Sequence, residues 1–284
     1  MVASIIDGKL VAAKLKSQIK DEVLLNVKCG KTPPGLAVIL VGNDPASTIY
    51  VNNKRRTCLE LGFNTHAYNL PTETRKEELL SLINTLNDDP NVHGILVQLP
   101  LPTHINTLEI IEHINPNKDV DGFHPYNLGR LAQGNPHLRP CTPFGIMKLF
   151  EHYRLSVAGQ HAVIVGASNI VGRPMALELL HAKATVTICH RQTKNLREHV
   201  RMADILIVAT GVPNVVEIEW LQPRQILIDI GIHRQLDRTI HGDVDFNLAK
   251  NKVAWITPVP GGAGPMTICM LLHNTLLAST HLSR

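Results

Sequence analysis

One helix expected from this sequence carries a lysine on a face that is otherwise aromatic or apolar. Four residues share that face of the helix expected over residues 46–61: Tyr50, Lys54, Cys58 and Leu61. An ammonium group withdrawn from water has a lowered pKa, so Lys54 could act as a general base or acid near neutral pH. The alternative is a lysine whose stem covers apolar surface while its charge reaches solvent. The helix alone leaves both interpretations open.

Polar side chains at a strand end and in the following loop could join that lysine. Gln98 lies at the end of an apolar strand expected over Gly94–Leu99, and ligands of open α/β sheets gather at such ends. The amide could equally hold a neighbouring loop. Asp119 and Asp121 flank Val120, so one could enter a cleft while the other serves the loop. An aspartate beside glycine is also common turn chemistry.

Metal chemistry is not expected from this sequence. Two lone aspartates form no calcium or zinc pattern. The 15 histidines form no HExxH or HxH cluster.

Two proline-rich segments could approach a ligand closely. RPCTPFG covers residues 139–145, and TPVPGGAGPMT covers residues 257–267, directly before an expected helix. Small residues let backbone lie against a flat ligand or a phosphate. Loop packing alone would explain the same composition.

A third segment predicts a nucleotide-binding unit. An apolar strand over residues 162–165 ends at Gly166, a helical pattern opens near Pro174, and a second strand follows over residues 185–188. This order is the βαβ unit in which backbone N–H groups and a helix N-terminus face a pyrophosphate. The glycine spacing departs from GxGxxG, because Ser168 occupies the middle position. A plain strand–helix turn of any α/β protein could look similar.

The end of the second strand indicates the cofactor. An NAD site usually carries Asp or Glu there for the ribose 2′-hydroxyl. This strand runs into His190 and Arg191, with no carboxylate until Glu198. A guanidinium suits a 2′-phosphate, so the sequence favours NADP. An ordinary solvated loop arginine is the alternative.

Strands and helices alternate along the chain, which predicts an α/β fold with parallel sheets. The 284 residues suffice for two modest domains. The expected helices cover residues 9–28, 46–61, 74–86, 105–114, 142–152 and 266–278. Further strands are expected over residues 35–41, 205–209, 226–230 and 253–257. Residues 115–140 read as a long functional loop.

Composition limits the partners. The net charge of +4 is dispersed, and the longest basic run, residues 54–56, is too short for a nucleic-acid footprint. No stretch has the length of a membrane span, and no signal peptide is expected. The 5 cysteines show no paired spacing, which predicts free thiols in a reducing cytoplasm.

The motifs together resemble the bifunctional methylenetetrahydrofolate dehydrogenase/cyclohydrolase family, particularly its bacterial members. The resemblance covers essentially the whole chain through IIDGK, YVNNKRRTCLELG, GILVQLPLP, KDVDGFHPYNLG, RPCTPFG, VGASNIVGRP, GDVDF and TPVPGGAGPMT. The departures are mild. Arg56 stands where a second lysine is frequent, Ala263 where valine is common, and His233 where a DIGI strand often continues with asparagine.

The resemblance implies a domain plan and two reactions. It implies a folate-binding catalytic domain from residues 1–140 and 266–284, and a Rossmann-like NADP-binding domain from residues 141–265. The C-terminal helix would return to the first domain. NADP⁺ would take a hydride from 5,10-methylenetetrahydrofolate, and water would open the resulting methenyl cation to 10-formyltetrahydrofolate.

The same resemblance implies roles for individual residues. Lys54 would transfer protons in the hydrolytic step, Gln98 would hold and tune it, and Asp121 would bond the pterin ring. The residues expected to contact the rest of the folate are Tyr50, Pro260, Gly261 and Gly262. Those expected to contact NADP are Gly166, Ala167, Ser168, Ile170, Arg191 at the 2′-phosphate and Ile232 near the nicotinamide.

The resemblance further implies a homodimer formed through the nucleotide domain, and a place in one-carbon metabolism that serves purine and amino-acid biosynthesis. Two other functions remain open from the residues. A shikimate-dehydrogenase-like enzyme would also pair a lysine with an aspartate, but its serine-rich N-terminal motif is not visible. A non-catalytic NADP-binding sensor would need no lysine on an apolar helix face.

Overall fold

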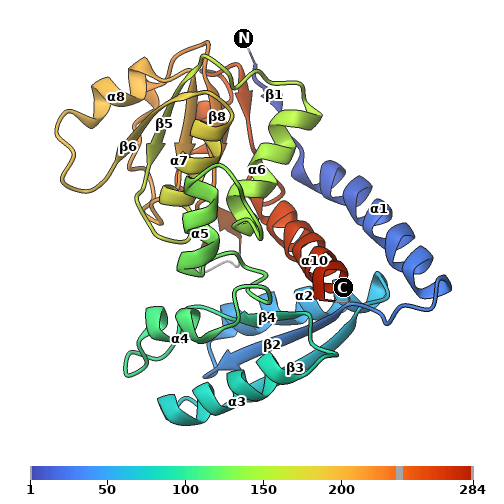
Figure 1. The fold of residues 1–284 in the computed structure, drawn as a ribbon. Helices are drawn as coiled ribbons and strands as arrows, with labels where there is room; N and C mark the ends of the chain where they lie inside the picture. Colours follow the sequence, from blue (N-terminus) through green and yellow to red (C-terminus); the bar gives the residue numbers. More distant parts are fainter. Residues whose placement is uncertain (1, 235–238, 283–284) are drawn as a thin grey trace. The chain divides into compact units, whose positions relative to one another are not determined.

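The chain folds into two compact units. The structure is a computed structural model that describes residues 2–234 and 239–282 (Figure 1). Residues 14–141 and 268–284 form one unit, and residues 1–13 and 142–267 form the other. We call them the three-stranded unit and the six-stranded unit after their sheets.

The three-stranded unit is built on a parallel sheet. Its strands lie in the order β3 (Asn64–Leu70), β2 (Gly35–Val41), β4 (Gly94–Val97). Every residue of the central strand β2 is buried, because it has a strand on each side and helices on both faces. An apolar run of this kind is the expected sequence of such a strand.

Helices cover both faces of this sheet, as Figure 1 shows. On one face, Ile39 of β2 packs in a core with Ile83 of α3 (Lys76–Asp88) and Ile110 of α4 (Thr107–His113). Helix α2 (Pro45–Glu60) covers the other face. It begins where Asp44 accepts a hydrogen bond from the Ser47 amide at 2.7 Å, with proline in the first turn.

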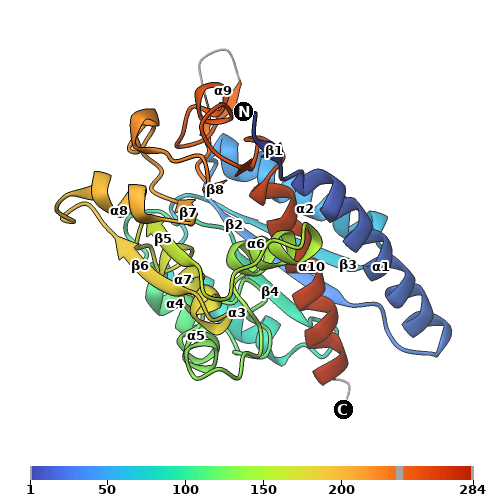
Figure 2. The same cartoon turned by 90° about the horizontal axis from the view of Figure 1, so that it is seen from above.

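The six-stranded unit contains an all-parallel sheet. Its strand order is β1-β11-β8-β7-β5-β6, and β6, β5 and β7 can be followed side by side in Figure 2. The bounds are β1 (Ser4–Ile5), β5 (His161–Val165), β6 (Thr185–Cys189), β7 (Ile205–Val208), β8 (Ile226–Asp229) and β11 (Trp255–Ile256).

Strand β5 is the point at which this sheet changes direction. The chain places β6 on one side of β5 and then returns to place β7 on the other. Ligands of open α/β sheets bind outside the carboxyl ends of the strands at such a switch point. The topology therefore directs attention to the loops that follow β5 and β7.

The remaining elements of the six-stranded unit surround this sheet. They are α6 (Cys141–His152), α7 (Gly172–His181), α8 (Leu196–Met202), the 3-10 helix η1 (Ile218–Trp220), α9 (Phe246–Ala249), and the antiparallel pair β9 (His233–Arg234) and β10 (Ile240–His241). Helices α1 (Gly8–Lys28) and α10 (Ala263–Leu282) contribute residues to both units. Among the described residues, no helix has both the length and the apolarity that a membrane span requires.

The fold class is confirmed, including the return of the C-terminal helix to the unit that contains β2. One element expectation was wrong: residues 115–140 are not a continuous loop, because α5 (Pro125–Ala132) lies within them. The His124 ring accepts from the Tyr126 amide at 3.0 Å and caps this helix. Strands β1 and β3 and helix α8 were not anticipated. The sequence of β3, NTHAYNL, is mostly polar because the strand lies at the edge of its sheet.

Candidate functional site

Helix α2 buries the lysine that the sequence singled out. Lys54 is only 4% exposed. Its Nζ donates a hydrogen bond to Gln98 Oε1 at 3.1 Å and lies 4.6 Å from the centre of the Tyr50 ring. A lysine that only covers apolar surface extends its charge to water. Lys54 instead directs its amine toward the half-buried Gln98 amide and an aromatic ring.

Burial controls the acidity of this amine. Loss of hydration lowers the pKa of Lys54 from its ordinary value, because an ammonium is destabilised away from water. Asp121 is the largest opposing influence on that pKa, and the Cys141 and Cys58 thiols oppose it to a smaller degree. A lysine with a lowered pKa can accept and return a proton at a pH closer to neutral.

The Gln98 amide has a fixed orientation. Its Nε2 donates to the Leu99 carbonyl at 2.7 Å, which leaves Oε1 facing the Lys54 amine. The sequence left two roles open for this amide, namely contact with a ligand-site residue or restraint of a loop. In the structure the amide bonds to the Lys54 amine on one side and to the backbone of the next residue on the other.

The two aspartates of the KDVDG segment serve different partners. The Asp119 carboxylate accepts from the His124 amide at 2.8 Å and from Asn127 Nδ2 at 2.9 Å, so it stabilises the loop. Asp121 interacts electrostatically with Lys54. Burial raises the pKa of Asp121 to about 6, although the Lys54 charge favours ionisation. A turn over this segment, not extended backbone, separates the loop-holding carboxyl from the one that is coupled to the lysine charge.

A residue of the C-terminal helix holds the segment around Asp121. Asn274 of α10 is 1% exposed, and its Nδ2 donates to the Val120 carbonyl at 2.9 Å and the Arg139 carbonyl at 2.8 Å. The Cys141 amide donates to the Asp121 carbonyl at 3.2 Å. Sequence reasoning missed Asn274. The available signal was an amide within an apolar helix.

The proline–glycine loop belongs to the six-stranded unit. The Gly261 carbonyl accepts from the Lys9 amide at 3.0 Å, and the Gly262 amide donates to the Pro258 carbonyl at 2.8 Å. The loop with Pro260 thus lies against the start of α1, in the IIDGK segment. The structure places these three residues in one unit, and Tyr50, Lys54, Gln98 and Asp121 in the other.

Two glycines shape the turn after β5. Gly166 has φ +127°, and a Cβ on it would lie 2.2 Å from the Ala209 carbonyl oxygen. A Cβ on Gly172, the first residue of α7, would lie 2.0 Å from the Gly166 carbonyl oxygen. The six-residue glycine spacing therefore has a structural reason. It lets strand, turn and helix approach more closely than side chains allow.

The polar groups of this turn organise the N-terminus of α7. Ser168 Oγ accepts from the Val171 amide at 3.2 Å and the Gly172 amide at 3.3 Å. Arg173 Nε donates to the Ala167 carbonyl at 3.2 Å, which sets a guanidinium beside the turn. Arg173 was not among the sequence candidates. Ile170 is 37% exposed on the same segment.

Arg191 follows β6 and Ile232 follows β8, so both lie at the carboxyl ends of the strands, as the Gly166 turn does. Cys189 of β6 pairs with Val165 of β5, so Arg191 follows β6 at the level where Gly166 follows β5. Ile232 comes after β8 and is 61% exposed. Both Arg191 and Ile232 are therefore available to a ligand lying across the carboxyl ends of these strands.

The residues of this edge fit an NADP dinucleotide. The close-packed Gly166 turn and the N-terminus of α7 suit a pyrophosphate. The exposed Arg191 stands where an NAD site usually carries a carboxylate, and a guanidinium matches the charge of a 2′-phosphate.

Two family models match the chain. One is described as the tetrahydrofolate dehydrogenase/cyclohydrolase catalytic domain and matches residues 6–121. The other is described as the NAD(P)-binding domain of the same proteins and matches residues 140–282.

Curated sequences and solved structures agree with these matches. The chain is 60% identical to the bifunctional protein FolD of Legionella pneumophila (strain Paris), over 99% of each chain. The crystal structure of the Campylobacter jejuni bifunctional FolD has a TM-score of 0.96 at 48% identity, covering 98% of this chain and 99% of that one. Trypanosoma brucei FolD, complexed with NADP and an inhibitor, has a TM-score of 0.95 at 35% identity, covering 100% and 99%.

A more distant likeness bears on the alternative functions. Shikimate dehydrogenase of Aquifex aeolicus has a TM-score of 0.52 at 14% identity, covering 88% of this chain and 97% of that one. At that identity the likeness concerns the fold alone.

Proposed function

The chain belongs to the tetrahydrofolate dehydrogenase/cyclohydrolase family, and from that membership we propose two reactions for it. It oxidises 5,10-methylenetetrahydrofolate to 5,10-methenyltetrahydrofolate with NADP⁺, and it hydrolyses the product to 10-formyltetrahydrofolate. The observation that carries this proposal is the Lys54 amine, which is buried, hydrogen-bonded to Gln98 and close enough to Asp121 for charge coupling.

The six-stranded unit serves the oxidation. The nicotinamide supplies the hydride acceptor when NADP⁺ is bound. Gly166, Ala167, Ser168 and Ile170 form the surface that receives the phosphates, which the close-packed turn and the α7 N-terminus support. Arg191 binds the 2′-phosphate, and Ile232 lies at the nicotinamide end. The protein's contribution to this step is placement, because hydride transfer needs no protein acid or base.

The three-stranded unit serves the hydrolysis. Water adds to the carbon of the methenyl cation and loses a proton. The carbon–N5 bond then breaks while a proton moves from the new hydroxyl oxygen to N5, and the oxygen becomes the formyl carbonyl. Lys54 carries these protons, because its lowered pKa lets a neutral amine accept them. A neutral amine also avoids repelling the cation.

We infer the folate contacts from the family resemblance. Tyr50 packs against the aminobenzoyl group, next to the amine that its ring already contacts. The Asp121 carboxyl bonds the pterin ring. Pro260, Gly261 and Gly262 are assigned to folate contact through their backbone. We thus assign folate binding and catalysis to residues 1–140 and 266–284, and NADP binding to residues 141–265.

An absorbance assay tests the proposed function. Purified protein is mixed with 5,10-methylenetetrahydrofolate and NADP⁺, and NADPH is followed near its own absorption band while the methenyl product is followed separately. NADPH formation that depends on the folate, together with hydrolysis of added methenyltetrahydrofolate, is expected. Turnover with shikimate in place of the folate, or cofactor binding without turnover, would overturn the proposal.

Assembly and cellular place extend the proposal. We propose a homodimer formed through the six-stranded unit, where β6 is an edge strand among the described residues and exposes Ile188 at 38%. Light scattering at micromolar concentration tests it. We also propose a cytoplasmic role in one-carbon metabolism that feeds purine and amino-acid biosynthesis. Reduced thiols suit a reducing compartment, and no disulfide joins the described residues Cys29, Cys58, Cys141, Cys189 and Cys269.

A further inference from the structure

The segment GDVDF contains a buried carboxylate that the two reactions leave without a role. Asp243 has an exposed fraction of 0%, and it lies in the six-stranded unit on the segment that follows β10. Burying a carboxylate is costly unless hydrogen bonds replace its water. The partners of Asp243 therefore show what this segment does.

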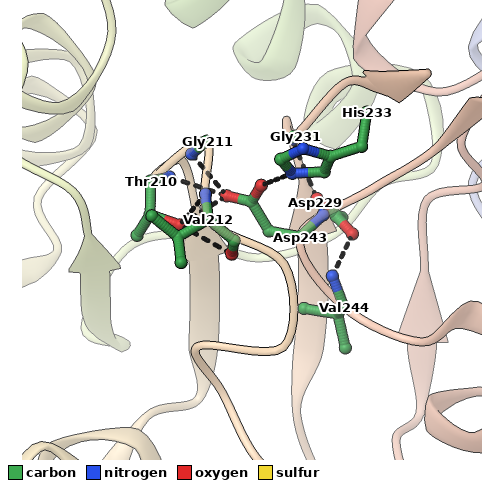
Figure 3. A network of polar contacts seen from close by, with 8 residues as sticks. All are labelled: Thr210, Gly211, Val212, Asp229, Gly231, His233, Asp243 and Val244. Atoms are coloured by element: carbon green, nitrogen blue, oxygen red, sulfur yellow. Dashed lines mark hydrogen bonds and ion pairs between the residues drawn. The ribbon is translucent and has the colours of Figure 1, made fainter. Parts of the chain in front are cut away.

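Asp243 connects the loops that follow two neighbouring strands, as Figure 3 shows. Its Oδ2 accepts from the Thr210 amide at 2.7 Å, the Thr210 hydroxyl at 2.8 Å and the Gly211 amide at 3.0 Å, all after β7. Its Oδ1 lies 2.7 Å from Nε2 of His233, after β8. A carboxylate accepts only, so this ring nitrogen carries the proton.

A second carboxylate completes the connection. Asp229, the last residue of β8, accepts through Oδ1 from the Gly231 amide at 2.9 Å and the Asp243 amide at 3.0 Å. Its Oδ2 accepts from the Val244 amide at 2.9 Å. A Cβ on Gly231 would lie 2.1 Å from Asp243 Oδ1. The loop after β8 and the Asp243 segment are thus packed together at backbone contact.

These bonds fix the backbone on both sides of Ile232. The amide of Gly231 is held by Asp229, and the ring of His233 is held by Asp243. Ile232 lies between these two residues. Its apolar side chain is exposed, although hydrogen bonds restrain the residue on each side of it. An exposed side chain on a restrained loop suits ligand positioning.

The same carboxylate restrains the other side of the switch point. Thr210 follows Ala209, whose carbonyl oxygen lies within 2.2 Å of where a Gly166 side chain would begin. The turn assigned to the phosphates therefore packs against Ala209, and Asp243 holds the amide of the next residue, Thr210. One carboxylate restrains both ends of the proposed cofactor surface.

We propose that Asp243 and His233 are positioning residues of the NADP site. The Asp243 carboxylate holds the loop after β7 directly and the loop after β8 through the His233 ring, and so sets the distance between Ile232 and the Gly166 turn. This inference rests on the proposed function of the site. It adds a specific use for His233, the position at which this chain departs from the asparagine frequent in the family.

Steady-state kinetics of four single variants test this proposal. His233→Ala removes the ring, His233→Asn keeps a side-chain N–H donor, and Asp243→Asn places an amide N–H against donors. The matched control is Asp204→Asn. Asp204 directly precedes β7, at the amino ends of the strands of the same sheet, and its carboxylate accepts from the His161 amide at 3.0 Å. Each is assayed for the KM of NADP⁺, the KM of the folate, and cofactor-independent hydrolysis of methenyltetrahydrofolate.

The expected pattern separates positioning from general stability. His233→Ala should raise the KM for NADP⁺ about tenfold, the scale of one hydrogen bond to a charged group, and Asp243→Asn should raise it further. His233→Asn should recover most of the loss. Hydrolysis should stay within about twofold in all variants, because it needs no cofactor. Asp204→Asn should change the melting temperature and leave the KM for NADP⁺ unchanged.

Three results would overturn the proposal. They are an unchanged KM for NADP⁺ in His233→Ala, equal KM increases in His233→Asn and His233→Ala, and an equal increase in Asp204→Asn. Should Asp243→Asn fail to fold, the two His233 variants decide the matter. The wild-type protein is assayed before any variant. If it does not reduce NADP⁺, the proposed function itself is refuted.

Discussion

Lys54 combines two properties that rarely occur together, deep burial and a hydrogen bond to a neutral amide. Gln98 Oε1 accepts from the amine without neutralising a charge, so burial continues to lower the pKa of Lys54. A carboxylate in place of that amide would favour the charged ammonium. The charge partner of Lys54 is instead Asp121, whose own pKa is raised by burial. Each group thus titrates closer to neutral pH than it would in water.

Replacing Lys54 by methionine should separate the two reactions. Lys54→Met keeps most of the stem volume and removes the amine. Hydrolysis of methenyltetrahydrofolate should fall roughly 100-fold or more, the usual scale of a lost acid–base group. NADP⁺ reduction should fall less, since hydride transfer depends on placement. Rates are measured by absorbance, with Arg56→Met as the control for an exposed cation on the same helix. Wild-type hydrolysis in Lys54→Met would make the lysine structural.

Ionised Asp121 should lower the free energy of unfolding at pH values above its titration range. Its pKa is about 6 in the folded protein and 3.8 in the reference state. A raised pKa means that the folded protein holds the proton more tightly, so its stabilising contribution is full below pH 4 and is lost as pH rises to 6. Asp121→Asn stays neutral. Denaturant titrations should therefore show the variant gaining stability relative to wild type between pH 4 and 6, by up to about 3 kcal/mol.

The partner of Asp121 provides the check on that pH prediction. In a Lys54→Met background the attraction that favours ionised Asp121 is absent. The advantage of Asp121→Asn should then still begin near pH 4 but keep growing above pH 6, because only the pKa of the folded state has moved. An advantage that does not vary with pH in either background would assign the effect to packing. The KM for the folate should rise in Asp121→Asn at every pH, because the pterin contact is lost.

At the scale of elements, local patterns were readable from the sequence and long-range contacts were not. The face of α2 that carries Tyr50 and Lys54 follows from helical spacing alone. The buried strand β2 follows from its uninterrupted apolar run. The bond between Asn274 and the Val120 carbonyl joins residues 154 positions apart, and no local pattern specifies such a pair. The polar strand β3 escaped for a related reason, because its pairing with β2 is not specified by a local pattern. Helix α5 was missed although its His124 cap is local, because its proline, asparagine and glycine residues resemble those of a loop.

Helix α10 should support folate binding through Asn274. Asn274→Leu keeps the branched shape of the side chain and removes the amide that donates to the Val120 and Arg139 carbonyls, at a cost of about 1–3 kcal/mol. Chemical denaturation should show that loss, and the KM for the folate should rise several-fold because the Asp121 segment loses its support. The control is Thr275→Val, which removes a hydroxyl that donates to the Leu271 carbonyl of the same helix at 2.8 Å. Equal folate KM changes in both variants would remove the special role of Asn274.

The carboxyl edge of the large sheet should select the cofactor through the loop after β6. Arg191→Ala should weaken NADP⁺ roughly tenfold or more and NAD⁺ hardly at all, because a hydrogen bond between charged groups contributes about 1.5–3 kcal/mol. Binding is measured by fluorescence titration with both cofactors. Arg197→Ala on α8 removes another exposed arginine of the same unit as a control. Equal losses for NADP⁺ and NAD⁺ would show that Arg191 does not read the 2′-phosphate.

At the scale of the molecule, each compact unit has its own core and its own proposed chemistry. Val163, Leu206 and Leu227 lie in a core of the six-stranded unit, and Ile39 and Ile83 lie in a core of the three-stranded unit. Helices α1 and α10 belong to both units. A core of its own lets each unit hold its ligand-contacting side chains rigidly. Lys54, assigned to proton transfer, lies in one unit, and the residues assigned to NADP lie in the other.

Hydrogen exchange should therefore report two separable binding footprints. Saturating NADP⁺ alone should slow exchange in the Gly166 turn, in residues 209–212 and in residues 230–233. Tetrahydrofolate alone should slow exchange in α2 and in residues 119–122, where Lys54 and Asp121 lie. At 100 times the dissociation constant, either ligand should add about 2.7 kcal/mol to the free energy of any opening that abolishes its binding. Protection of α2 by NADP⁺ equal to that of the Gly166 turn would contradict the assignment of separate ligand groups to the two units. His233→Ala supplies the internal control, since it should reduce the NADP⁺ footprint in residues 230–233 and leave the tetrahydrofolate footprint intact.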